Sequence, residues 1–260
     1  MSGTVDTSAT IAHRDDWVRA WPLNKPALIV LAKGAAVLIV AWSTIGLLYM
    51  ALLDDGSVGD ADRSLARRLE DSRTPTLNTL SHVGSMLSET LVKVILVAVV
   101  GGAMVIVWRR WHDGVFLALA VSLEASVFVI VSFIVDRDRP PVVQLDPPAP
   151  SGSFPSGHTA AAVAFYAGVY LIVRWHTTNR VVRAVFAVVA VAAPLIVAAS
   201  RVYRGMHHPL DVVAGLLLGI TALIVARAVL TAGVEKIDRD SGDSFHERVR
   251  RLDLTTGANR

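Results

Sequence analysis

The sequence predicts an all-α fold, a bundle of six transmembrane helices. Of its 260 residues, 53% are hydrophobic and only 18% are charged, and the mean hydropathy is +0.52. Six apolar segments each approach or exceed the roughly 20 residues that a helix needs to cross a bilayer. They show no internal repeat, such as the two similar halves of many transporters. A helical membrane protein follows from these three observations.

The six segments lie at residues 27–53, 90–108, 114–135, 158–175, 181–199 and 210–230. The first 26 residues are polar and lack the apolar core of a cleavable signal peptide, so the first spanning helix is expected to act as the targeting signal. We therefore expect a cytoplasmic segment at 1–26 and the membrane domain at 27–230. A polar cytoplasmic tail, partly disordered because it cannot bury a core, is expected at 231–260.

Residues 54–89 form the first loop outside the apolar segments. Within it, Leu65 and Leu69 are four apart in a charged stretch, which is typical of a surface helix lying on the membrane. A solvated connecting helix is the alternative.

The placement of Lys and Arg predicts the orientation. With a cytoplasmic N-terminus, sixteen of the 25 Lys and Arg residues lie on the cytoplasmic side and eight on the other, with Lys93 inside the second segment. Both termini are then cytoplasmic, and the membrane is a plasma membrane. The loop at 136–157 and the stretch at 200–211 face outward together.

Composition also excludes several classes of protein. The chain has no cysteine, which rules out disulfides, thiolate zinc sites and cysteine nucleophiles. The net charge is only +3, and the basic residues do not cluster as a nucleic-acid-binding surface would require. We expect no nucleic-acid partner.

The stretch from Ser200 to Asp211 concentrates ionisable groups between two apolar segments, where charges are costly unless they have a partner or a function. Pro209 favours a helix start, which places Asp211 in the first turn, on the same face as His207. A carboxylate there could accept the Nδ1–H of the imidazole and leave Nε2 free as a nucleophile. Arg201 offers a planar guanidinium that suits phosphate oxygens.

A second group of polar residues precedes the fourth apolar segment. Pro155 and Gly157 break the chain, so a helix is expected to begin at Gly157–His158 with its free N–H groups and positive dipole end outward, which suits an anion. Ser156 adds a hydroxyl, and His158 could protonate a leaving oxygen. Arg139 follows the third segment and could reach the same site.

These motifs resemble the three-part signature of the phosphatidic acid phosphatase type 2 superfamily. The matching parts are Arg139-Pro140, Pro155-Ser-Gly-His158, and Ser200-Arg201 followed after five residues by His207 and after three more by Asp211. The resemblance spans about residues 75–230. Its members are membrane lipid phosphatases, with vanadium haloperoxidases as soluble relatives.

The resemblance implies a role for each matching residue. His207 looks like the nucleophile, Asp211 like its orienting partner and His158 like the general acid. The phosphate-binding residues would be Arg139, Ser156, Gly157 and Arg201. No metal or other cofactor is implied, because the arginines supply the positive charge, and the substrate would be a lipid phosphate.

One position departs from the family pattern. A lysine is expected seven residues before Arg139, and this chain has Ser132 there. Arg137 or Lys93 could replace the missing cation, although Lys93 could instead extend to the membrane interface. Arg204 is expected to contact substrate or lipid headgroups. Glu124, deep in the third segment, is expected to have a polar partner.

The expected reaction is hydrolysis of a lipid phosphomonoester or diphosphate through a phosphohistidine. Undecaprenyl diphosphate, phosphatidate and phosphatidylglycerol phosphate are the substrate classes that the resemblance permits. A lipid phosphotransferase of the same superfamily and a non-catalytic lipid-phosphate-binding protein are the alternatives. A haloperoxidase is disfavoured by the six apolar segments.

Overall fold

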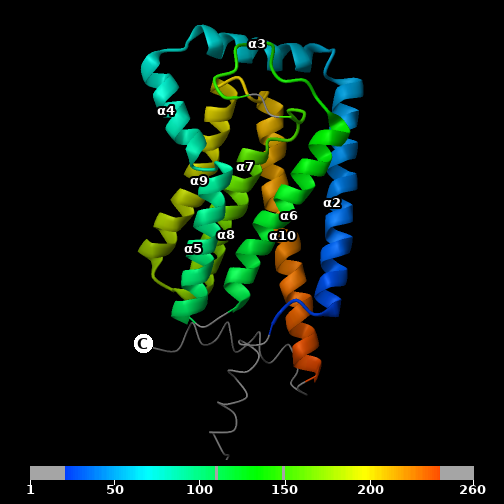
Figure 1. Ribbon diagram of the computed structural model, residues 1–260, viewed down its shortest axis with the longest axis vertical. Coiled ribbons are helices and arrows are strands. Elements are labelled where there is room, and N and C mark those ends of the chain that lie inside the picture. The colour runs from blue at the N-terminus through cyan, green and yellow to red at the C-terminus, as the bar shows by residue number, and fades with distance from the viewer. Residues whose placement is uncertain (1–20, 109–110, 148–149, 241–260) are drawn as a thin grey trace, which may run out of the picture.

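The computed structural model describes residues 21–108, 111–147 and 150–240, and throughout those ranges the chain forms helices and loops without strands. Figure 1 shows the longer helices running along one axis, with α3 (Ser57–Asp71) lying across one end of the bundle. This arrangement confirms the all-α prediction. Most of the expected N-terminal segment and of the C-terminal tail, residues 1–20 and 241–260, lies outside the described residues.

Each expected apolar segment forms helix close to its expected bounds. The helices are α2 (Lys25–Leu52), α5 (Thr90–Trp108), α6 (Trp111–Val135), the uninterrupted run of α7 (Gly157–Ala162), η1 (Val163–Ala167) and α8 (Gly168–His176), α9 (Arg180–Tyr203), and α10 (Pro209–Asp240). α10 begins at Pro209 as expected but continues to Asp240, ten residues past the expected end. The first part of the expected tail is therefore helical.

The structure supports fewer membrane spans than the six expected. α2, α6, α9 and α10 are each long and apolar enough to cross a bilayer. α4 (Pro75–Met86) and α5 bend by 44° at their junction and could form a fifth span together. The run from Gly157 to His176 is divided by the π-helical turn η1, so neither α-helical piece qualifies alone. The protein is a multi-pass membrane protein, and six spans remain a prediction.

α4 was not expected from the sequence. Its start carries a clear local signal, because the Thr74 hydroxyl accepts a hydrogen bond from the Leu77 N–H (3.2 Å) and Pro75 is the first helical residue. Gly84 lets α4 approach α9, since a Cβ at that position would collide with the Ser200 side chain. α4 therefore packs directly against a segment that carries site residues.

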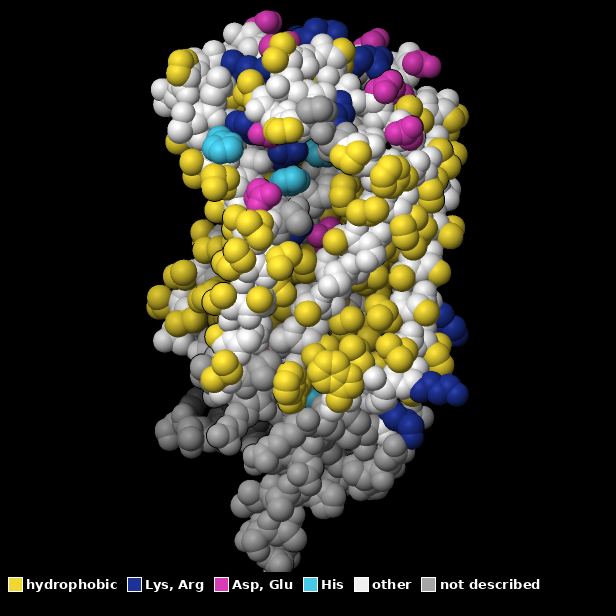
Figure 2. Space-filling view, viewed as in Figure 1, with side chains coloured by type: hydrophobic (Ala, Val, Ile, Leu, Met, Phe, Trp, Pro, Cys, Tyr) yellow, Lys and Arg dark blue, Asp and Glu magenta, His cyan; other side chains and the backbone are white. Residues whose placement is uncertain are grey.

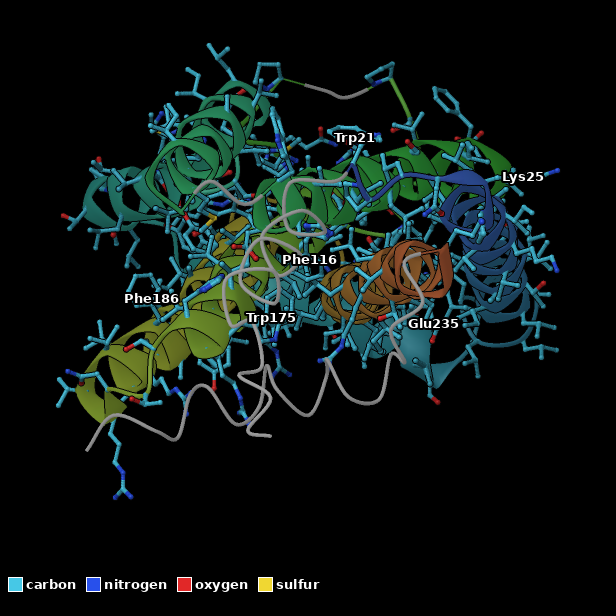
Figure 3. The ribbon with its side chains drawn as sticks, turned by 90° about the horizontal axis from the view of Figure 1, so that it is seen from below. Trp21, Lys25, Phe116, Trp175, Phe186 and Glu235 are labelled. Atoms are coloured by element: carbon cyan, nitrogen blue, oxygen red, sulfur yellow. The ribbon has the colours of Figure 1, made fainter. Side chains whose placement is uncertain are left out.

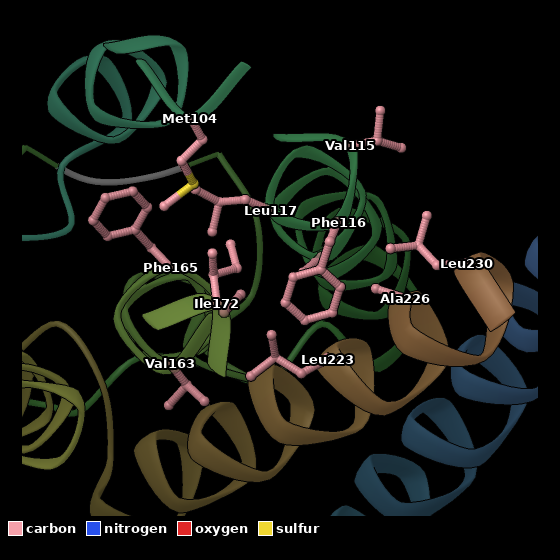
Figure 4. Close-up of a cluster of buried hydrophobic side chains, with 12 residues drawn as sticks. Met104, Val115, Phe116, Leu117, Val163, Phe165, Ile172, Leu223, Ala226 and Leu230 are labelled. Carbon is pink, nitrogen blue, oxygen red and sulfur yellow. The ribbon is translucent and has the colours of Figure 1, made fainter. Parts of the chain in front are cut away.

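An apolar core packs α5, α6, η1, α8 and α10 against one another. Figure 4 shows Met104, Phe116, Leu117, Phe165 and Leu223 converging from α5, α6, η1 and α10. At the end farthest from α3, the rings of Phe116 and Trp175 meet edge to face, 5.0 Å apart (Figure 3). Large apolar side chains also cover much of the outer surface, as a lipid-facing bundle requires (Figure 2).

The fold brings the polar motifs to one end. The end of α6, the start of α7, the last turn of α9 and the start of α10 all lie near α3 (Figure 1). The described ends of the chain lie at the opposite end of the bundle. The expected convergence of the three motifs is thus a property of the helix arrangement.

Candidate active site

His207 is buried and held by a backbone carbonyl. Its Nδ1 lies 2.7 Å from the Ser153 carbonyl oxygen, and because that oxygen can only accept, Nδ1 must carry the proton. The lone pair is then on Nε2. The nearest Asp211 oxygen is 3.9 Å from Nδ1, too far for a hydrogen bond. The expected hydrogen bond to Asp211 is therefore wrong, and Ser153 fixes the tautomer instead.

The loop that supplies this carbonyl is tightly packed. The Ser153 N–H donates to the Arg137 carbonyl at 2.7 Å, and its hydroxyl donates to the Asp138 carbonyl at 2.9 Å. A Cβ on Gly152 would lie 2.7 Å from the Arg137 nitrogen, so only glycine fits there. These contacts fix the carbonyl that orients His207.

Asp211 caps its own helix. It is the third residue of α10, and its Oδ2 accepts the His208 backbone N–H at 2.8 Å, the reciprocal half of a capping box. Its Oδ1 accepts from Arg137 at 2.6 Å. The side chain is fully buried. Asp211 thus shapes the turn that carries His207, rather than contacting the imidazole.

Arg137 is enclosed by carboxylates. Its guanidinium pairs with Asp54 at 2.8 Å, with Asp62 at 3.0 Å and with Asp211 at 2.6 Å, and it donates to the Tyr49 hydroxyl. Only 1% of its side chain is exposed. The suggestion that Arg137 replaces the missing phosphate-binding lysine is therefore wrong, since its donors face this cluster.

The helix start expected at Gly157 is confirmed. A Cβ at Gly157 would lie 2.8 Å from the Phe128 ring, so no larger residue fits. The Ser156 N–H donates to the Asp211 carbonyl at 2.9 Å, which joins two of the motifs. The Ser156 hydroxyl, however, pairs with the Thr159 hydroxyl at 3.0 Å.

Arg201 is held from two sides and keeps a free donor. It donates to the Ser85 hydroxyl at 3.0 Å and to Asp146 at 2.8 Å. Its Nε is buried and has no hydrogen-bond partner among the described residues. Such a donor suits an anion, because an unpaired buried N–H is costly.

Arg204 is engaged elsewhere. It binds both oxygens of Asp146 and donates to the Leu145 carbonyl and the Ser81 hydroxyl. Its expected contact with substrate or lipid headgroups stays a prediction. The pKa of Asp146 is lowered. Burial alone would raise it, but the hydrogen bond from Arg204 and the charge of Arg201 lower it by more than burial raises it.

Arg139 and His158 complete the site. Arg139 is half-buried and donates to the backbone carbonyls of Met206 and Ser151. Among the described residues it has no carboxylate partner within ion-pair distance, unlike Arg137. His158 is partly exposed at the start of α7, and its carbonyl accepts from the Ser88 hydroxyl at 2.7 Å.

Sequence reasoning located the motif residues but missed three of their partners. Ser153, Asp146 and Ser85 hold His207 and Arg201. The helix-start signal at Thr74 and Pro75 could have indicated α4, the helix that carries Ser85. The other two act through loop geometry that no local pattern reveals.

The buried histidines predict acid sensitivity. Burial, with the charges of Arg201 and Arg139, lowers the pKa of His207 well below 6.5, and burial beside Arg137 lowers that of His208 to about 4. Below pH 6.5 the unfolded chain binds protons that the folded chain does not, so stability falls by up to about 1.4 kcal/mol per pH unit for each such histidine. We expect the Tm in detergent to fall from pH 7 to pH 5. The slope should be smaller in His208→Gln, and an equal slope would contradict the assignment.

The fold and the site together define a helical membrane protein in which arginines and histidines gather at one end of the bundle. Residues 113–233 match the model of the PAP2 superfamily. The resemblance inferred from the motifs is confirmed.

Two curated relatives are similar to this chain. Phosphatidylglycerophosphatase B of Bacillus subtilis is 27% identical over 187 residues, which cover 70% of this chain and 89% of the relative. Undecaprenyl-diphosphatase of Sulfolobus acidocaldarius is 26% identical over 147 residues, 53% of this chain and 66% of the relative.

Two solved structures share the fold. The transmembrane PAP2-type phosphatidylglycerolphosphate phosphatase of Bacillus subtilis superposes with a TM-score of 0.65 at 24% identity, over 73% of this chain and 94% of the other. LpxE of Aquifex aeolicus superposes with a TM-score of 0.51 at 25% identity, over 64% of this chain and 93% of LpxE.

Proposed function

We propose that this protein hydrolyses a lipid phosphomonoester or diphosphate, with His207 as the nucleophile. The observation that carries the proposal is the neutral, buried His207, whose Nδ1–H is bound by the Ser153 carbonyl so that Nε2 is free to attack. The positive charges of Arg201 and Arg139 help to lower the pKa of His207, which keeps the imidazole neutral. The match of residues 113–233 to the PAP2 superfamily supports the same chemistry.

In the first step, Nε2 of His207 attacks phosphorus in line and the bond to the leaving oxygen breaks. Arg201, Arg139 and the N–H groups at the start of α7 stabilise the charge on the equatorial oxygens. A protonated His158 gives its proton to the leaving alkoxide or phosphate. The products of this step are a phosphohistidine and the dephosphorylated or monophosphorylated lipid.

In the second step, neutral His158 accepts a proton from water, which attacks phosphorus. The P–N bond breaks, and inorganic phosphate leaves with His207 restored to its neutral state. Asp211 contributes by fixing the turn that carries His207, and Ser156 by joining the start of α7 to α10. Positioning and electrostatic stabilisation account for the catalysis.

The relatives indicate the substrate class. Their names refer to phosphatidylglycerol phosphate and undecaprenyl diphosphate, and phosphatidate carries the same phosphomonoester group. The excess of Lys and Arg on the side of the termini supports an extracytoplasmic site in a plasma membrane, with both termini cytoplasmic. A phosphotransferase is the second candidate, because an acceptor hydroxyl can replace water in the second step.

The test is phosphate release by the purified protein in detergent. Undecaprenyl diphosphate, phosphatidate and phosphatidylglycerol phosphate would be supplied separately, each with and without EDTA. We expect release that EDTA does not reduce, because arginines rather than a metal neutralise the phosphate. Phosphate found on an added alcohol instead of in solution would favour the transferase. Release that EDTA abolishes would contradict the mechanism.

A further inference from the structure

A pair of opposite charges lies within the bundle, outside the three motifs. Lys93 on α5 and Glu124 on α6 approach to 3.7 Å, with 13% and 1% of their side chains exposed. Both belong to apolar helices, where ionisable side chains are costly and mark function or a partner. The expected polar partner of Glu124 is therefore Lys93.

The pairing leaves both groups incompletely satisfied. The separation of 3.7 Å exceeds a hydrogen-bond length. Neither oxygen of Glu124 has a hydrogen-bond partner among the described residues, although both are buried. A buried pair maintained for stability alone would be expected to satisfy its remaining donors and acceptors. The Lys93 ammonium has three N–H donors and can serve a second acceptor.

The helix that carries Lys93 begins beside His158. Ser88, just before α5, donates to the His158 carbonyl at 2.7 Å, and Tyr166 donates to the Leu87 carbonyl at 3.0 Å. Lys93 lies about one turn farther along, in the first turns of α5. Figure 2 shows basic, acidic and histidine side chains gathered in a hollow around the junction of α4 and α5.

We propose that Lys93, oriented by Glu124, supplies a further positive charge to the phosphate site and favours substrates whose phosphate carries two or more negative charges. A phosphomonoester or a terminal diphosphate has that charge, whereas a phosphodiester has only one. This inference rests on the proposed function and identifies what the site selects. Lys93 acts on the bound phosphate, and Glu124 is a positioning residue that acts through Lys93.

The test compares variants that change the local charge in opposite directions. Inorganic phosphate would be titrated as a competitive inhibitor of lipid phosphate hydrolysis by the intact protein, Lys93→Met and Glu124→Gln. We expect Lys93→Met to raise the inhibition constant about tenfold or more, because one charged contact is lost. Glu124→Gln should also raise it, but by less, because Lys93 keeps its charge and loses only the carboxylate that orients it. Lys33→Met is the matched control, since Lys33 is exposed on α2, and should leave the constant unchanged.

A structural role makes a different prediction. If the pair only stabilised the bundle, both single variants would lower the Tm, and the double variant Lys93→Met/Glu124→Gln would recover both Tm and phosphate affinity. We expect the double variant to recover Tm while phosphate inhibition stays weak. An inhibition constant within twofold of the intact protein's in Lys93→Met would overturn the inference.

Failure of the proposed function would be recognised separately. If the intact protein released no phosphate from any lipid, binding would be measured as the rise in Tm caused by inorganic phosphate. A smaller rise in Lys93→Met would support the inference without turnover, and an equal rise would overturn it.

Discussion

His207→Ala is expected to reduce phosphate release by at least about 10³-fold, because the variant lacks the atom that accepts the phosphoryl group. The fold should survive, since the alanine removes one hydrogen bond to the Ser153 carbonyl and leaves the helix start at Pro209 intact. The measurement is the initial rate of phosphate release, with Tm recorded on the same preparations.

A matched histidine separates this effect from the general loss of an imidazole. His82 is exposed on α4, and His82→Ala should retain the activity of the intact protein. The phosphohistidine can be detected directly with a ³²P-labelled lipid phosphate and a quench that avoids acid. We expect ³²P bound to the intact protein and none bound to His207→Ala. Near-normal release by His207→Ala would refute the mechanism.

Arg137→Met is expected to destabilise the fold by about 3–5 kcal/mol, which corresponds to a fall in Tm of roughly 10 °C or more. The substitution would leave Asp54, Asp62 and Asp211 close together in a buried place without their shared cation. Thermal unfolding in detergent at pH 7 would measure the change.

Arg139→Met is the contrasting variant. Arg139 is bound only by backbone carbonyls among the described residues, so its replacement should reduce phosphate release strongly and stability little. Adding Asp62→Asn to Arg137→Met should restore part of the lost stability, because one uncompensated carboxylate is removed. If Arg139→Met proved the more destabilising of the two, the roles assigned to these arginines would be reversed.

The sequence predicted the helices and the motif residues well because both depend on local patterns. Pro209 and Gly157 begin helices where their chemistry favours a start, and the apolar segments match the observed helices within a few residues, apart from the longer α10. The number of spans is different: six are expected from the sequence, and four or five helices qualify among the described residues, because the π-helical turn η1 divides the fourth segment.

Contacts between distant segments could not be predicted in this way. Arg137 and Arg139 are two residues apart and equally basic, yet Arg137 lies among carboxylates from the turn after α2, from α3 and from α10, while Arg139 faces backbone carbonyls. Asp211 and His207 have the spacing of a hydrogen-bonded pair, but a loop carbonyl lies closer to the imidazole. Only the packing of the helices decides between these partners.

The cluster around Arg137 also has a consequence for how the chain is made. Asp54, Asp62 and Arg137 emerge from the ribosome long before Asp211, and synthesis proceeds from the N-terminus. Until the last helix is inserted, Arg137 can pair with Asp54 and Asp62 but not with Asp211, and the turn that carries His207 does not yet exist. Asp211 therefore completes the charge cluster and the turn of the reactive histidine in the same late step. A chain truncated before α10 would lack catalytic activity and would keep an incomplete ion cluster.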